Sequence, residues 1–309
     1  MQPLGIVAQW TVQSDGTRVI TYQLTQDLSF SSNKIGPSRS VNSRVDMTAY
    51  SEMIYGWCLP RILHFVMSLR THNPGVRILI SKYDYSDAYR RLAHSWAAAM
   101  QTIAVVGQTA YMALRLTFGG CPNPPSFCLF SELVTDLANE LGNCRAWNPA
   151  VVFSPSQPRA PDPVRLPMSV PVEPARPMSV LGPASDSGRV DGFIDDLISV
   201  FLDTPTNLVR HTQSVPLAMH LTSRPHAGED SDPIPRRPIL SQSKLEAEGS
   251  PSEIQIVLGW RVDTRRMTVS LPDDKFKAWS SDLRELRNRD TCHHTSMVLP
   301  DSSHFLSRI

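Results

Sequence analysis

This sequence lacks three features that mark common protein classes: paired cysteines, a long apolar run and a large net charge. Its five cysteines stand at positions 58, 121, 128, 144 and 292, an odd number without short paired spacing. This pattern argues against a disulfide framework and a four-cysteine zinc site, and it favours a reducing, intracellular compartment, either cytoplasm or nucleus. Cys292, His293, His294 and His304 make a poor zinc cluster because adjacent ligands point in different directions.

Membrane insertion and export are also disfavoured. The first residues lack the basic segment followed by an apolar segment that marks a signal peptide. The most apolar stretch, Trp96–Leu114, is interrupted by glutamine and threonine and is too polar to span a bilayer. We therefore expect a soluble protein with no membrane partner. The formal net charge of +1 excludes a strongly basic nucleic-acid-binding coat but allows a local basic groove.

Proline, in contrast, is abundant and unevenly distributed. Ten of the 26 prolines lie between residues 149 and 183, where Pro-Met-Ser-Val occurs at 167–170 and again at 177–180. Proline removes a backbone donor and fixes φ, so this composition predicts an extended, disordered insertion rather than a helix or a sheet. Such segments also bind SH3-type and WW-type grooves, which makes a proline-motif-binding protein a candidate partner of 149–183.

Hydrophobic periodicity predicts helices and strands on both sides of the insertion. Helices are expected from Asp46 toward Leu69 with a kink before Pro60, over Ser126–Leu141, over Asn207–Leu221 with an interruption at Pro216, and from Pro272 toward Leu286. Strands are expected at Val19–Leu24, Val76–Ser81, Ile254–Arg261 and Thr268–Leu271, and Gln101–Val106 is expected to pair with Ala110–Leu116 in a hairpin.

The most distinctive local feature is the pair Asp195-Asp196, which lies between apolar, β-prone flanks. Inside a buried strand one of two adjacent acids would enter the core, whereas at the tip of a hairpin both reach an open cleft. Two carboxylates this close repel each other, and a divalent cation is the usual way to hold them together. A third acid, Asp84, ends another strand-like run. Together the three acids indicate a two-metal phosphoryl-transfer site.

Four segments around these acids occur in an order that is typical of one enzyme family. Residues 82–89 read Lys-Tyr-Asp-Tyr-Ser-Asp-Ala-Tyr, 116–127 read Leu-Thr-Phe-Gly-Gly-Cys-Pro-Asn-Pro-Pro-Ser-Phe, 193–196 read Phe-Ile-Asp-Asp, and 258–260 read Leu-Gly-Trp. They resemble the first, second and third catalytic motifs and the primer-grip region of reverse transcriptases. The closest resemblance is to DIRS-like or gypsy-like retrotransposons. Residues 26–29 and 40–42 of this chain also resemble the fingers segment of that group.

The resemblance implies an α+β fold, the palm and fingers of a right-hand polymerase with a truncated thumb, interrupted by the proline-rich segment. It implies RNA-directed DNA polymerase activity, in which dNTPs are added to a DNA primer on an RNA template with two magnesium ions, or manganese in their place. The implied catalytic and metal-binding residues are Asp84, Asp195 and Asp196. The implied nucleotide-binding residues are Tyr89, Phe118, Gly119 and Lys244, and the implied primer-binding residues are Leu258, Gly259 and Trp260.

The same resemblance divides the chain into five parts. Residues 1–80 form a fingers-like segment, and 81–148 form palm and fingers with the first two motifs. Residues 149–188 are the proline-rich insertion, 189–271 are palm with the Asp-Asp hairpin and the primer-grip-like strands, and 272–309 begin the thumb and end in a tail.

Several of these residues also have a purely structural explanation. Asp84 can cap a following helix, Tyr89 can pack in a core, and Lys244 can be a solvated charge. The pair Phe118-Gly119 can form an ordinary turn between a strand and a helix.

Three positions depart from the family pattern. Gln23 stands where an arginine that binds the triphosphate is usual, Thr117 replaces a proline, and Phe193 replaces a tyrosine. Glutamine cannot make the bidentate charged contact of arginine. The alternative hypothesis is therefore a catalytically decayed or domesticated fragment, which acts only as a nucleic-acid-binding or interaction protein.

Overall fold

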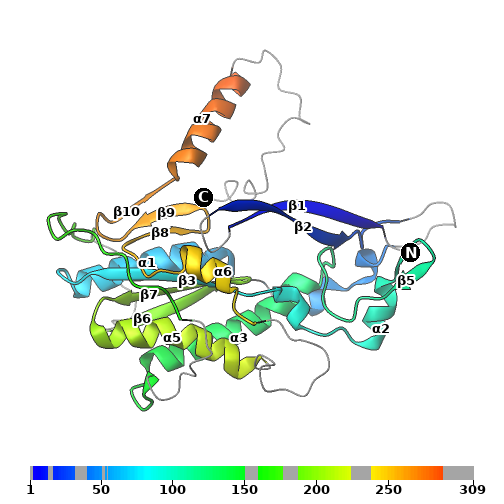
Figure 1. Ribbon diagram of the computed structural model, residues 1–309, viewed down its shortest axis with the longest axis horizontal. Helices are drawn as coiled ribbons and strands as arrows, with labels where there is room; N and C mark the ends of the chain where they lie inside the picture. The colour runs from blue at the N-terminus through cyan, green and yellow to red at the C-terminus, as the bar shows by residue number, and fades with distance from the viewer. Residues whose placement is uncertain are drawn as a thin grey trace.

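The computed structural model describes residues 3–12, 17–31, 40–50, 53, 55–149, 159–176, 187–223 and 238–287. Within them the chain is a mixed α+β fold built from small antiparallel sheets and helices (Figure 1). The strands are β1 (Leu4–Val12), β2 (Arg18–Gln26), β3 (Ile78–Asp84), β4 (Ala104–Val106), β5 (Thr109–Tyr111), β6 (Gly188–Phe193), β7 (Asp196–Leu202), β8 (Ile254–Val257), β9 (Trp260–Asp263) and β10 (Thr268–Ser270). The α-helices are α1 (Cys58–His72), α2 (Trp96–Ala99), α3 (Asn123–Asn143), α5 (Pro205–Thr222), α6 (Gln242–Glu248) and α7 (Asp273–Arg287), and short 3-10 turns cover Asn42–Arg44, Met47–Ala49, Tyr55–Trp57, Ala88–Arg91 and Met100–Thr102.

The central sheet has the strand order β3-β7-β6, with both pairs antiparallel. Side chains alternate between its two faces because successive residues of a strand point in opposite directions. Tyr83 and Leu197 belong to one buried cluster, whereas Ile80 and Ile198 belong to another. The sheet is therefore buried on both faces, which explains the nearly continuous apolar sequence of β7.

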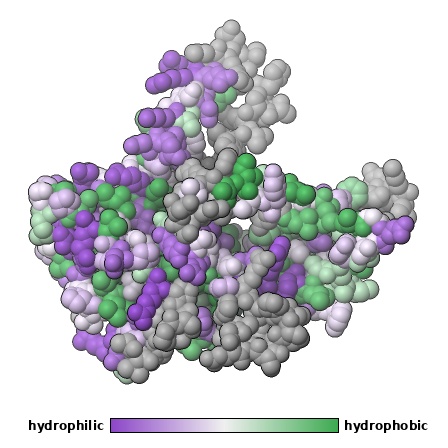
Figure 2. All heavy atoms as spheres, in the orientation of Figure 1, coloured by the Kyte–Doolittle hydropathy of each residue, from purple (hydrophilic) through white to green (hydrophobic). Residues whose placement is uncertain are grey.

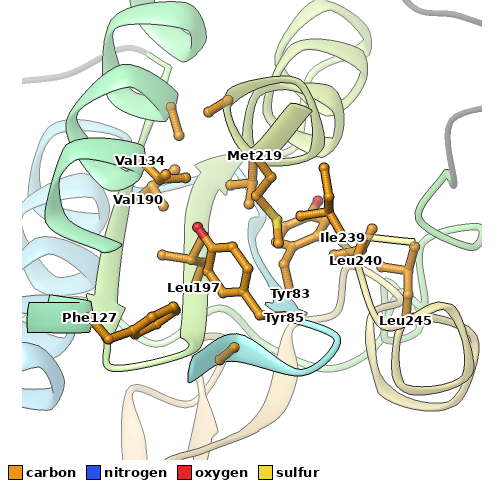
Figure 3. Packing of buried hydrophobic residues seen from close by; sticks show 14 residues of the cluster. Tyr83, Tyr85, Phe127, Val134, Val190, Leu197, Met219, Ile239, Leu240 and Leu245 are labelled. Carbon is orange, nitrogen blue, oxygen red and sulfur yellow. The ribbon is translucent and has the colours of Figure 1, made fainter. Parts of the chain in front are cut away.

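The first cluster lies between the sheet and helices α3, α5 and α6. Figure 3 shows Phe127 and Val134 of α3, Met219 of α5 and Leu245 of α6 around Tyr83, Tyr85 and Leu197. Pro124 and Pro125 lie in the first turn of α3, where their missing N–H groups leave no partner unsatisfied. The helix predicted at Ser126–Leu141 is thus confirmed and is slightly longer.

The second cluster joins the other face of the sheet to α1 and to the hairpin β8–β9. Its apolar members include Ile62, Leu69, Val257 and Val262. Beside it lies a buried ion pair in which Arg265 Nη2 donates to Glu253 Oε2 at 3.0 Å. Buried charges need partners of this kind, because an unpaired one would destabilise the fold by several kcal/mol, roughly 3–5.

Two helix predictions need correction at proline. The helix expected from Asp46 begins only at Cys58, and Pro60 lies in its first turn instead of causing a kink. Asp46 instead caps the short turn Met47–Ala49 by accepting the Thr48 N–H. Pro216 lies inside α5 without ending it.

The carbonyl that Pro216 leaves unpaired in α5 has another donor. Proline has no N–H for the carbonyl four residues earlier, that of Thr212. The Tyr83 hydroxyl donates to this carbonyl at 3.2 Å. A tertiary hydrogen bond therefore stabilises α5 where the local rule predicted an interruption.

The sequence predicts disorder for the proline-rich segment, of which 150–158 and 177–186 lie outside the described residues. Residues 159–176 form neither a helix nor a named strand, they turn at 168–169, and Ala160 packs against the first hydrophobic cluster. Extended backbone suits proline, and other elements satisfy its polar groups. The hydrogen bonds run from Val164 N to Pro251 O at 2.8 Å, from Leu166 N to Glu253 Oε2 at 2.9 Å, from Glu173 N to Arg265 O at 2.9 Å, and from Arg165 to Asp203 at 2.7 and 2.9 Å.

Two elements extend from this core (Figure 1). The ribbon β1–β2 runs along one side of the molecule, and α7 projects from the end of β10 with none of its residues buried. Hydrophobic residues gather over the ribbon and the adjoining β4–β5 hairpin (Figure 2). No described helix is both long and apolar enough to cross a bilayer.

One buried histidine makes the stability of this core depend on pH. His211 of α5 stacks on Phe201 of β7, with ring centroids 5.4 Å apart, and neither ring nitrogen has a hydrogen-bond partner in the described part of the chain. Burial, with a smaller contribution from repulsion by Arg210, lowers the pKa of His211 to about 4. The folded protein therefore binds this proton less readily than the unfolded chain does.

We expect the wild type to lose stability on acidification from pH 7 to 5, through this histidine alone, by about 2 kcal/mol. The sign follows because the unfolded histidine protonates near its ordinary pKa of 6.5, whereas the folded one does not until about 4. His211→Phe keeps the stacked ring and removes the titration, so urea unfolding at both pH values measures the difference. His72→Gln, an exposed site, is the control. An equal acid loss in His211→Phe and wild type would contradict the prediction.

Candidate active site

The strand register brings two of the three predicted acids together. Asp84 is the last residue of β3, Asp196 is the first residue of β7, and the two are direct cross-strand partners. Side chains in such a pair lie on the same face, with Cβ atoms roughly 5 Å apart. Asp195 precedes Asp196 in the two-residue turn between β6 and β7, since Phe193 pairs with Asp196. The adjacent acids therefore lie at the tip of a hairpin.

The tip of this hairpin has an unusual backbone. Ile194 has φ 55°, whereas Asp195 is absent from the residues with positive φ, which is the pattern of a type II′ turn. Glycine normally takes the first turn position, because a β-branched residue with positive φ costs roughly 1–3 kcal/mol. Ile194 packs against the first hydrophobic cluster, and this contact favours its strained conformation. The turn fixes the direction of both carboxylates.

A lysine from a distant part of the chain contacts the acids. Lys244 of α6 places its Nζ 2.8 Å from Asp84 Oδ2. The segment before α6 is tied to β3 by backbone hydrogen bonds, from Ser241 N to Asp84 O at 2.9 Å and from Ser86 N to Ile239 O at 2.7 Å. Lys244 is thus held at the cluster by its helix. The carboxylate of Asp84 contacts an ammonium group and does not cap a helix.

Burial and mutual repulsion set the protonation of the three acids. Burial raises the pKa of Asp84 to about 7, with a smaller contribution from Asp195, while Lys244 opposes the shift. Burial, followed by repulsion from Asp195, raises the pKa of Asp196 to about 6. The pKa of Asp195 is also raised, mainly by burial. Burial alone would lower the pKa of Lys244, but its attraction to Asp84 raises it.

These shifts show that burial disfavours the charged form of each acid, and that Asp195 adds repulsion at Asp84 and Asp196. A second lysine, Lys82, lies nearby but forms its own pair with Glu248 at 2.6 Å. Across the described ranges, no group of three acid, histidine or cysteine side chains is arranged to hold a metal ion. The acids are therefore an electrostatically coupled cluster in which the Lys244 ammonium supplies the nearest positive charge.

Aromatic residues border the acidic cluster. Tyr89 contacts Phe118 and Phe127 edge to face, with ring centroids 5.0 and 5.6 Å apart. Burial raises the pKa of Tyr89 to about 12, and the negative charge of Asp195 contributes. Tyr89 is therefore both a packing residue and a neighbour of the acids. The packing explanation is confirmed, whereas the nucleotide-binding role stays a prediction.

The predicted nucleotide-binding glycine is required by the protein itself. Gly119 has φ +104°, and an added Cβ would lie 1.9 Å from the Gln26 carbonyl oxygen. Asn42 holds the same loop, because its Nδ2 donates to Gly119 O at 2.8 Å and its Oδ1 accepts from Cys121 N at 3.0 Å. The sequence places Asn42 only within the fingers-like segment 40–42, and these long-range contacts give it a structural role.

The primer-grip-like residues form a turn where a continuous strand was predicted. Leu258 and Gly259 are the two turn residues of the β8–β9 hairpin, both with positive φ, and Trp260 begins β9. The strand predicted over Ile254–Arg261 is therefore two strands. Leu258 and Phe193 both pack against the second hydrophobic cluster, so this cluster adjoins the acidic hairpin and the β8–β9 turn.

Similarity to known proteins assigns this chain to no family. No family model matches the chain, and no curated protein matches it. Among solved structures, the chain is similar to the foamy viral protease-reverse transcriptase dRH in complex with ds DNA, with a TM-score of 0.45 and 12% sequence identity. The similarity covers 93% of this chain and 34% of that one, so this chain spans about a third of its length.

The pairing of Lys244 with Asp84 predicts a measurable energetic coupling. We expect Lys244→Met to destabilise the fold at pH 8, because the acids lose their nearest counter-charge, and to cost less in an Asp84→Asn background. The coupling energy should be about 1 kcal/mol, since the lysine is half exposed. Urea unfolding of the wild type, the two single variants and the double variant measures it. Lys82→Met, which removes a different ion pair, should be additive with Asp84→Asn. Additivity of the Lys244 pair as well would refute the coupling.

Proposed function

We propose that this chain is the palm and fingers portion of an RNA-directed DNA polymerase from a retroelement of DIRS-like or gypsy-like type. The substrates are dNTPs, and the partners are an RNA template and a DNA primer. The proposal rests on the acidic cluster. Its support is the β3–β7 register, which places Asp84 opposite Asp196 with Asp195 in the adjoining turn.

The donor set suits the cations that such a reaction uses. Carboxylate oxygens are the ligands that magnesium and manganese prefer. The pKa values of Asp84 and Asp196 are raised mainly because burial disfavours their charged form, and a bound divalent cation would stabilise that form. Asp84, Asp195 and Asp196 would hold two such ions. When bound, they stabilise negative charge on the attacking and leaving oxygens of an in-line phosphoryl transfer.

The neighbouring residues take complementary roles in this proposal. Lys244 keeps its proton at Nζ, because the acids raise its pKa, and this ammonium can pair with an anionic diphosphate. Tyr89 lies near Asp195 and contacts Phe118, and in this proposal the two rings position the sugar and base of a nucleotide. Leu258, Gly259 and Trp260 support the primer strand from the β8–β9 turn.

The first test is magnesium-dependent primer extension by the purified chain on an RNA template. We expect Asp84→Asn, Asp195→Asn and Asp196→Asn each to reduce the rate by about a thousandfold or more, because several kcal/mol of charge stabilisation is lost. The matched control is Glu140→Gln, an exposed acid of α3. Extension by Asp195→Asn at the wild-type rate would exclude this mechanism.

A second test concerns the sugar of the nucleotide. If Tyr89 closes the space beside the ribose 2′-position, a smaller side chain should admit ribonucleotides. We expect Tyr89→Val to raise the ratio of rNTP to dNTP incorporation by about tenfold or more, measured as kcat/KM for each substrate. Phe130→Leu, another partly buried position of the aromatic cluster, is the packing control. An unchanged ratio in Tyr89→Val would assign Tyr89 to packing alone.

The alternative function is nucleic-acid or partner binding without catalysis. Two observations favour it: Lys244 contacts Asp84, and no three-ligand metal group occurs within the described residues. This alternative predicts that a primer–template duplex binds while no extension occurs, even with manganese. Fluorescence anisotropy of a labelled duplex, measured alongside the extension assay, separates the two functions.

A further inference from the structure

A cavity of about 490 Å³ lies apart from the acidic cluster, between the β1–β2 ribbon and the segment from β5 to Phe118. Its walls are largely apolar and include Leu4, Leu24, Val106 and Leu114. It lies in the region where Figure 2 shows hydrophobic residues over the ribbon. This volume is in the range, about 300–1,000 Å³, of pockets that bind small molecules.

Two polar groups in the wall of this cavity have no partner in the described structure. Gln26 is only 9% exposed, and its Nε2 donates to Thr102 O at 2.9 Å, whereas its Oε1 accepts no hydrogen bond. Thr117 Oγ1 is buried and also has none. Both residues line the cavity. Both oxygens are closed off from solvent, so an occupant of the cavity meets mainly apolar side chains.

The same cavity is lined by two arginines, Arg90 and Arg115. Their contacts within the chain are weak. Arg90 Nη1 lies 3.9 Å from Asp87 Oδ1, and Arg115 Nη1 lies 3.4 Å from the Arg91 carbonyl oxygen. None of the described residues that line the cavity is an aspartate or a glutamate. Guanidinium groups bind carboxylate, sulfonate and phosphate groups with several directed hydrogen bonds, so the charge of the cavity calls for an anion.

We propose that this cavity binds a small amphipathic acid. The occupant has an apolar body that fills the space beside Leu24 and Leu114, and one anionic group that reaches Arg90 and Arg115. A nucleic-acid strand fits less well. Its phosphates need a continuous row of cations, and here two guanidiniums border walls that are otherwise mostly apolar.

The proposal does not depend on polymerase activity, because the cavity contains none of the three acids. Phe118 is the residue common to both sites, since it lines the cavity and contacts Tyr89. Loss of polymerase activity in the acid variants and loss of ligand in the cavity variants are therefore separate outcomes.

The test uses two fluorescent probes on the full chain. The probe 8-anilinonaphthalene-1-sulfonate carries an apolar body, an N–H donor and an anionic group, and N-phenyl-1-naphthylamine is its uncharged counterpart. We expect the sulfonate to bind with one site per chain and about tenfold more tightly than the uncharged probe, because only the sulfonate pairs with the arginines. Equal affinities of the two probes for the wild type would overturn the proposal without any variant.

Variants locate the site. The double variant Arg90→Gln, Arg115→Gln should lower the sulfonate affinity about tenfold and leave the uncharged probe unchanged. The double variant Arg284→Gln, Arg287→Gln on α7 removes the same charge elsewhere and should change neither. An unchanged affinity in the Arg90, Arg115 variant, or stoichiometric displacement of the probe by a single-stranded oligonucleotide, would overturn the proposal.

Discussion

The antiparallel pairing of β3 with β7 is the constraint on which the rest of the site depends. Its register fixes Asp84 opposite Asp196 and leaves room for only two residues in the turn that carries Asp195. A slip of one residue would turn the side chains of a strand to the other face and would separate the acids. The register is specified because both faces are buried, with Tyr83 and Leu197 in one cluster and Ile80 and Ile198 in the other. The hydrophobic core thus positions the acids indirectly.

Placing three carboxylates together creates an electrostatic problem that the fold resolves by bringing in another element. Helix α6 is tied to β3 through the backbone of Asp84 and Ser86, and it supplies Lys244 to the cluster. The acids are buried, which is the main reason why the pKa values of Asp84 and Asp196 stay above their ordinary range. The buried acids and their contact with Lys244 are compatible with two hypotheses. Three neighbouring carboxylates attract a divalent cation. Lys244, however, already pairs with Asp84, so a cation must compete with this ammonium group.

The aromatic rings and the loop at Gly119 show how packing and a proposed nucleotide site share residues. Tyr89 and Phe118 belong to an aromatic cluster, and Tyr89 also lies near Asp195. The Gln26 carbonyl lies so close to Gly119 that a side chain at this position would clash with it. Glycine is therefore required here whether or not a nucleotide binds. Asn42 and Gln26 connect the N-terminal ribbon to this loop. Phe118 contacts Tyr89 and also lines the cavity beside the β1–β2 ribbon.

The sequence by itself determined the local features: the adjacent acids at a hairpin tip, the α3 helix begun by Pro124 and Pro125, and the β4–β5 hairpin around Gly107. These depend on side-chain alternation and turn chemistry among near neighbours. Only the tertiary structure decided that Lys244 contacts Asp84, that Leu258-Gly259 is a turn, that α5 continues through Pro216 with help from Tyr83, and which elements residues 159–176 contact. Each of these is set by a partner far away along the chain, and local propensity contains no information about such partners.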